Sequence, residues 1–192
     1  LAGLSITTGV DNTLIGGLAG DALTDADYNV ALGKNALGSD TLGSMSVAIG
    51  NGALTTQNFT TATNTYNVGI GMGAGSSITT ATENTLIGGL TGDSLTTGGA
   101  NLAVGYKALS ASNTAAGNVA LGANAMLVDT KGARNVAVGY GTLMAQNYWS
   151  AKYSHRERCV IYRRRSWSKC SNRLSSTSNF ERRSRWFYRS YW

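Results

Sequence analysis

A nine-residue motif recurs along most of this chain, and its spacing limits the possible folds more than any other feature. The motif reads NVALGKNAL at residues 29–37 and SVAIGNGAL at residues 46–54. Successive copies begin at a constant seventeen-residue spacing, except for one longer interval that holds a four-residue insertion near residues 58–65. A fixed short period is typical of a solenoid, in which each repeat forms one coil. The eight copies begin at Asn12, Asn29, Ser46, Asn67, Asn84, Asn101, Asn118 and Asn135.

Each position of the motif keeps its chemical character. The first residue is Asn or Ser, the next three are mainly apolar or small, and the fifth is always Gly. A short apolar run between turn-forming residues predicts a β-strand. The Gly after each strand predicts a backbone angle that a Cβ would oppose. These structural glycines are Gly16, Gly33, Gly50, Gly71, Gly88, Gly105, Gly122 and Gly139.

The short period predicts an all-β fold. One repeat is too short for a strand and a packed helix, so we expect a parallel β-roll or β-helix with two short strands and two turns per coil, stacked about 4.8 Å apart. Side chains alternate across a strand, so Val30 with Leu32, and Val47 with Ile49, are expected to face one core. Small residues such as Ala31 then face the other way, and association of several chains is expected to bury that second face. The Asn/Ser row at the first position is expected to form a ladder along the rod or to cap its turns.

The motif N-x-A-[VIL]-G-x-x-A-L resembles the head repeats of YadA-like trimeric autotransporter adhesins. Copies such as NLAVGYKALSASNTAAG (101–117) resemble even more closely the repeats of phage tail-fibre proteins. This resemblance covers residues 12–143. It implies a left-handed β-roll, a homotrimer, and a place outside the cell on a virion or on a bacterial cell surface. It also implies a structural fibre or adhesin shaft, not an enzyme, that attaches to a host receptor, a glycan or another surface.

The composition changes abruptly after residue 147. Residues 1–147 hold all 25 Gly, with 4 Lys+Arg and 8 Asp+Glu, whereas residues 148–192 hold 12 Lys+Arg and 2 Asp+Glu. The first part is therefore expected to be the repeat array, and the second part an irregular or disordered basic tail. Arginines 163–165 next to Trp167 could neutralise phosphates and stack on bases. Binding of nucleic acid or an anionic surface by a genuine tail is thus an alternative function, although we favour a different origin for these residues.

A shifted reading frame is the interpretation that we favour for residues 148–192. Lys152 follows Asn135 at the spacing of the repeat, and Lys169 follows Lys152 at the same spacing. KYSHR (152–156) could be encoded by AAA TAC AGT CAT CGG, and the same bases without the first one read Asn-Thr-Val-Ile-Gly, which is a repeat strand. We therefore hypothesise that the array continues in the shifted frame. Sequencing codons 130–192 tests this, because codons that cannot encode the repeat in any frame would refute it.

The sequence predicts no catalytic, cofactor or metal site. Cys159 and Cys170 lack the spacing of a zinc site, and His155 is the only histidine. GIGMGAG (69–75) lacks the GK[ST] ending of a phosphate-binding loop. No apolar run approaches the ~20 residues of a membrane span. We therefore expect no enzyme, no cofactor and no membrane-spanning segment.

The spacers between the motifs carry the remaining candidates. Asp21, Asp25 and Asp27 could bind Ca²⁺ weakly, but solvated turn residues are the interpretation that we favour for the spacer carboxylates, Asp40 included. Threonines at the fifth position before the next motif suggest a second alternative, an ice-binding face: Thr24, Thr41, Thr79, Thr96 and Thr130. Receptor contact is expected in the insertion, because loops tolerate variation that the coil positions do not. Its candidate residues are Gln57, Asn58, Phe59, Thr60 and Tyr66.

Overall fold

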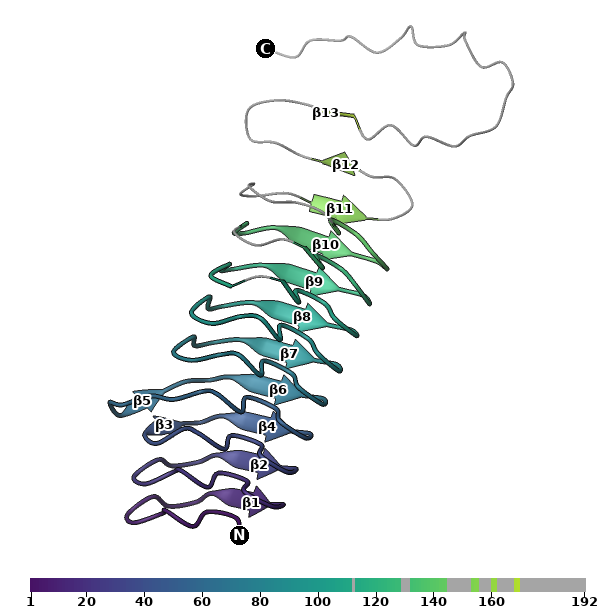
Figure 1. Cartoon of the computed structure of the whole chain (residues 1–192). Helices are drawn as coiled ribbons and strands as arrows, with labels where there is room; N and C mark the ends of the chain where they lie inside the picture. Colours follow the sequence, from purple (N-terminus) through teal and green to yellow (C-terminus); the bar gives the residue numbers. More distant parts are fainter. Residues whose placement is uncertain (112, 129–131, 145–152, 156–159, 162–167, 170–192) are drawn as a thin grey trace, which may run out of the picture.

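The described part of the chain is a stack of coils. The computed structural model describes residues 1–111, 113–128 and 132–144, and the strand backbone of residues 153–155, 160–161 and 168–169. These residues form a parallel β-solenoid in which each repeat makes one coil (Figure 1). No helix occurs in the part of the chain that the structure describes. The predicted all-β solenoid is therefore confirmed.

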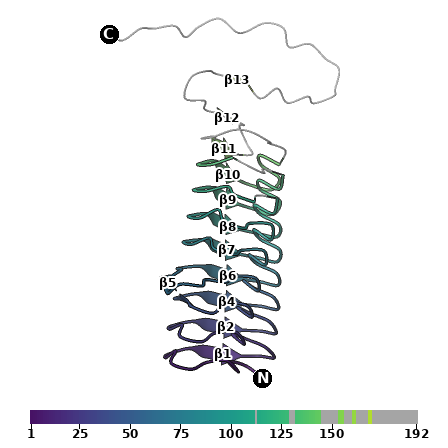
Figure 2. The ribbon, with the colours of Figure 1, turned by 60° about the vertical axis from the view of Figure 1, so that its left-hand side comes forward.

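The repeated strands form one parallel sheet of nine strands in the order β1-β2-β4-β6-β7-β8-β9-β10-β11. Turned by 60°, the same strands ascend in one column (Figure 2). The sheet strands are β1 (Thr13–Ile15), β2 (Val30–Leu32), β4 (Val47–Ile49), β6 (Val68–Ile70), β7 (Thr85–Ile87), β8 (Leu102–Val104), β9 (Val119–Leu121), β10 (Val136–Val138) and β11 (Tyr153–His155).

The prediction of two strands per coil holds only beside the insertion. There, β3 (Gly43–Ser44) and β5 (Thr63–Asn64) pair with each other in parallel. Elsewhere in residues 1–111, 113–128 and 132–144, the coil outside the sheet is made of turns and irregular backbone. One strand per coil is sufficient because backbone hydrogen bonds between turns also join the coils, such as the bond from Leu37 N to Ala53 O at 3.0 Å.

The seventeen-residue register extends past the change of composition. Val136 of β10 pairs with Tyr153 of β11, as Val119 pairs with Val136 one coil earlier. Beyond it, β12 (Val160–Ile161) and β13 (Ser168–Lys169) pair with each other in antiparallel fashion. The other residues of the tail, which is expected to be irregular, lie outside the described ones. The hypothesis of a shifted reading frame stays a prediction.

In the sheet strands from β1 to β10, the middle residue faces the interior, and the two residues beside it face outward. Ala31 is fully buried, whereas Leu32 is 43% exposed. The prediction that Val30 with Leu32, and Val47 with Ile49, face the core is therefore wrong, although each pair does share one side. The prediction that association buries the alanine side is wrong for the same reason. Beneath most strands there is room only for a small middle residue, because large side chains from the turns fill the space: Leu23, Leu37, Leu54, Ile78, Leu95, Leu109 and Met126. The middle residue of β7, Leu86, is itself large and fully buried, and the turns beside it hold Gly75 and Gly92.

The glycine after each strand permits the close approach of neighbouring coils. All eight structural glycines have φ angles between +118° and +134°, a region that residues with a Cβ rarely adopt. A Cβ built on Gly71 would lie 2.5 Å from the carbonyl carbon and oxygen of Gly88 in the next coil. Both the backbone angle and the spacing of the coils therefore require glycine here.

The asparagine row joins each coil to the next. Oδ1 of Asn101 accepts a hydrogen bond from the backbone N–H of Asn118 at 2.9 Å. Its Nδ2 donates to the carbonyl of Ala115, also at 2.9 Å. The row therefore performs both expected roles, because one amide links two coils and also satisfies a turn carbonyl. Most of the row is fully buried, so water is not available to replace these bonds.

Replacing Asn101 with alanine is expected to lower the free energy of unfolding by roughly 2–5 kcal/mol, since a buried N–H and a buried carbonyl lose their partner. Urea denaturation of the purified chain measures this loss. Asn113→Ala is the matched control, because Asn113 is exposed. An equal loss for the two variants would show that the row does not hold the coils together.

Candidate assembly surface

The outer side of the sheet is a continuous apolar strip, which we call the assembly face. It consists of the outward residues of the strands β1 to β10 that belong to the nine-stranded sheet, and all of them except Thr13 and Thr85 are Val, Ile or Leu. Ile15 is 58% exposed and Ile87 is 37% exposed. The members are Thr13, Ile15, Val30, Leu32, Val47, Ile49, Val68, Ile70, Thr85, Ile87, Leu102, Val104, Val119, Leu121, Val136 and Val138.

The assembly face together with the rows that border it has the size of a protein–protein interface. Eight coils about 4.8 Å apart give a length of roughly 40 Å, and the seven residues from one border to the other give a width of about 20 Å. The resulting area is on the order of 800 Å², which is what each partner contributes to a standard interface. The apolar strip alone is about 10 Å wide and covers on the order of 400 Å², and exposed apolar patches of this size are often functional.

Two rows of residues border the assembly face. We call the residue before each motif the leading edge: Asp11, Tyr28, Met45, Tyr66, Glu83, Ala100, Gly117 and Arg134. We call the residue after each structural glycine the trailing edge: Gly17, Lys34, Asn51, Met72, Gly89, Tyr106, Ala123 and Tyr140. The four tyrosines are between 53% and 57% exposed. An apolar centre with an aromatic and charged border has the composition of an interface.

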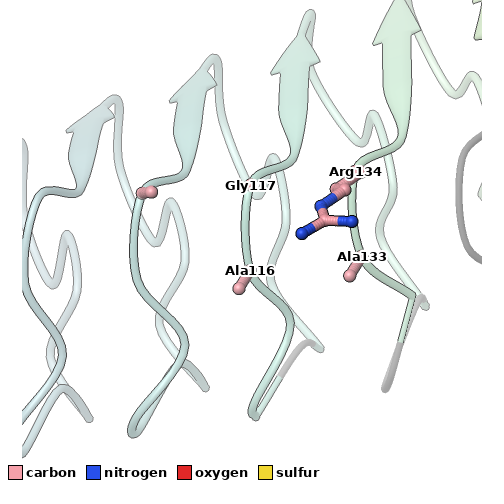
Figure 3. A pocket seen from close by; sticks show the side chains of 5 residues that line it. Ala116, Gly117, Ala133 and Arg134 are labelled. Atoms are coloured by element: carbon pink, nitrogen blue, oxygen red, sulfur yellow. The ribbon is translucent and has the colours of Figure 1, made fainter.

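A shallow pocket lies on the leading edge near the C-terminal end of the described array. It is lined by Ala100, Ala116, Gly117, Ala133 and Arg134 and has a volume of about 330 Å³ (Figure 3). The stem of Arg134 extends toward the preceding coil, since a Cβ built on Gly117 would lie 3.4 Å from Arg134 Cγ. The pocket thus combines small side chains with one guanidinium group.

The insertion forms a lobe that projects beside the stack at β5 (Figures 1 and 2). Of the residues predicted to contact a receptor, Gln57 and Phe59 are buried, so this part of the prediction is wrong. Asn58, Thr60 and Tyr66 are exposed. Only the outer residues of the lobe are therefore accessible to a partner.

A buried polar cluster fixes the root of the lobe. Asp40 is fully buried and is not the solvated turn residue that the sequence predicts. Its Oδ2 accepts a hydrogen bond from Gln57 Nε2 at 2.6 Å, and its Oδ1 accepts from the backbone N–H of Phe59 at 2.9 Å. Gln57 Oε1 in turn accepts from Asn67 Nδ2 at 2.9 Å. Asp40 and Gln57 were missed as core residues, although some other coils hold Leu or Ile at their position.

The threonine row contributes to stacking. Thr24 Oγ1 donates to the carbonyl of Thr41 at 3.1 Å, and Thr79 Oγ1 donates to the carbonyl of Thr96 at 3.1 Å. Thr96 Oγ1 likewise donates to the carbonyl of Asn113 at 2.8 Å. Thr130 lies outside the described residues. Since these hydroxyl hydrogens bond to the protein, the row offers little support for an ice-binding face.

Several spacer carboxylates accept hydrogen bonds from neighbouring donors, whereas Oδ1 of Asp21 is buried without one. Asp27 Oδ1 accepts from the backbone N–H of Val10 at 2.8 Å, and Asp25 Oδ1 accepts from the hydroxyl of Thr8. Within the described ranges, no three His, Cys, Asp or Glu residues come together as a metal site would require. Cys159, Cys170 and the tail arginines lie outside those ranges. The same ranges contain no helix with the length and hydropathy that a membrane crossing requires.

Comparisons with protein-family models, with curated proteins and with solved structures find no match to this chain. The likeness to fibre and adhesin repeats therefore rests on the motif residues alone. The geometry of the assembly face is an independent observation, because it comes from burial and strand direction.

Proposed function

We propose that this chain is the shaft of a homotrimeric fibre, displayed outside a virion or a bacterial cell, that attaches to a host or to another surface. The observation that carries the proposal is the continuous apolar assembly face. Three such faces around an axis parallel to the stack bury the strip against its own copies. Packed sheets lie about 10 Å apart, so side chains of Val, Ile and Leu size fill the space between them.

Three copies suit a face that is only one short strand wide. Both outward residues of a strand, such as Val68 and Ile70, point toward the common axis when three narrow sheets surround it. The motif resemblance implies the same number of copies. Each coil then packs against its two neighbours in the stack and against two other chains, which compensates for its thin interior.

The proposed mechanism is geometric and requires no chemical reaction. A rod of stacked coils holds the lobes away from the particle that carries it. Three identical chains present three lobes at one level, so that several weak contacts with a receptor or glycan combine into strong attachment. The buried bonds of Asp40 and Gln57 position the root of each lobe.

A glycan array probed with the labelled full chain tests the attachment. Binding is expected to fall at least tenfold when Thr60 and Thr61, which are exposed on the lobe, are both replaced by alanine. The control replaces Thr80 and Thr97, which are exposed on other coils, in the same way. Unchanged binding by the lobe variant would contradict attachment through the lobe.

A further inference from the structure

We infer that the copies assemble with their coils level, so that the leading edge of one copy meets the trailing edge of the next. At one corner, a tyrosine of the trailing edge enters the pocket beside Arg134. The inference rests on the proposed self-association and adds the contacts that fix the register of the copies.

The arrangement of the faces decides which edges meet. When parallel copies surround an axis along the stack, the end of each strand points toward the start of the corresponding strand in the next copy. A leading edge therefore always meets a trailing edge. Such an interface is heterologous and closes into a ring by rotation.

The two edges complement each other when the coils are level. At β2, Tyr28 would meet Lys34 of the next copy, and at β10, Arg134 would meet Tyr140. Both are cation–π pairs. Two further level pairs join Tyr66 to Met72 at β6 and Ala100 to Tyr106 at β8. The first is a sulfur–aromatic contact, and the second sets a small residue opposite a large one.

A shift by one coil loses this complementarity. In one direction, Arg134 would face Ala123 and Tyr66 would face Asn51. In the other direction, Tyr28 would face Asn51 and Tyr66 would face Gly89. That shift loses both cation–π pairs; it gains an ion pair between Asp11 and Lys34, which contributes little when exposed, and it sets Gly117 opposite Tyr140. The level register is thus the one that the edges favour.

The direction of the edge side chains brings a ring to the pocket. Arg134 extends back over Gly117 (Figure 3). On the other edge, Tyr106 extends back in the same sense, since a Cβ on Gly89 would lie 3.6 Å from its ring. Tyr140 occupies the equivalent position two coils further on. With the same direction, the ring of a neighbouring copy's Tyr140 reaches the level of Gly117, where the pocket of about 330 Å³ has room for it.

Disulfide cross-linking of the full chain tests the register. In a background carrying Cys159→Ser and Cys170→Ser, the level pair is Ala100→Cys with Tyr106→Cys. These positions flank β8 in one chain and are too far apart for a bridge within it, since a disulfide needs Cα atoms within about 7 Å. Oxidation is therefore expected to give covalent trimers. The offset control, Ala100→Cys with Lys34→Cys, joins the edges of β8 and β2 and is expected to give none.

Sedimentation of the same samples separates the two proposals. Trimers that the level pair does not cross-link, or that the offset pair does cross-link, would overturn the register and leave the self-association intact. Monomers in both samples and in the unmodified chain would overturn the self-association, and the register with it. Trimers cross-linked only by the level pair support both.

Filling the pocket tests the tyrosine contact separately. Ala116→Leu is expected to raise, at least tenfold, the protein concentration at which half of the trimers dissociate. The reason is that the added side chain occupies the space of the Tyr140 ring. Ala62→Leu adds the same group to the lobe, at another exposed alanine, and is expected to change nothing. An equal half-dissociation concentration for the two variants would overturn the contact.

Discussion

Replacing Gly71 with alanine is expected to lower the free energy of unfolding by about 3 kcal/mol or more. The residue has φ of +130°, and strained backbone of this kind costs about 1–3 kcal/mol by itself. The new Cβ would also lie 2.5 Å from the backbone of Gly88, so two coils would have to separate in the middle of the sheet. Single domains are stable by only about 5–15 kcal/mol, so this loss is a large part of the total.

A second glycine separates the two causes. Gly52 also has a positive φ, of +67°, but a Cβ there would meet no atom within 4 Å. Other coils hold Asn35 and Lys107 at the same position with similar angles. Gly52→Ala is therefore expected to cost only about 1–2 kcal/mol. Denaturation at one fixed protein concentration compares the two variants, and equal losses would contradict the role assigned to the close coil contact.

Replacing Ile70 with aspartate is expected to weaken self-association at least a hundredfold. Ile70 lies near the middle of the assembly face, and three copies of the new carboxylate would meet near the axis. An unpaired buried charge costs several kcal/mol, and like charges add to that cost. The fold of each chain is expected to survive, because the side chain points away from the interior.

The control for this variant places the same charge elsewhere. Thr97→Asp adds a carboxylate at an exposed position outside the assembly face, and the association is expected to stay unchanged. Sedimentation velocity measures the association, and circular dichroism shows whether the strands persist. If Ile70→Asp unfolds the chain as a core substitution would, or leaves its association intact, the assignment of the outer face is wrong.

The sequence predicts the architecture well because the period is a property of the whole coil. It does not predict which side of the strand lies inside. The alternation of side chains places Val30 and Leu32 on the same side of the strand but does not show which side is buried. The usual expectation that the larger apolar residues are buried fails at these two positions. The residues of the turns decide: Leu37 and Leu54 fill the space beneath their strands, whereas Leu86 fills it where the turns hold Gly75 and Gly92. The strand pattern does not contain the conformation of those turns. The buried Ala31 is the consequence.

The lobe shows a second limit of the sequence pattern. Asp40 lies in a spacer of regular length and Gln57 lies just before the insertion, and both resemble polar loop residues. The structure buries both and bonds them to each other. Counted from the start of the preceding motif, Asp40 and Gln57 occupy the same position as the core residue Leu23. Polar residues at an apolar position are therefore the signal that could have identified this cluster.

Sedimentation equilibrium of the purified chain over a wide concentration range shows whether the assembly face is buried by copies of the chain itself. A species of three times the chain mass of 20.0 kDa is expected. A folded chain that remains monomeric at every concentration, with its apolar face open to water, would contradict the proposed self-association.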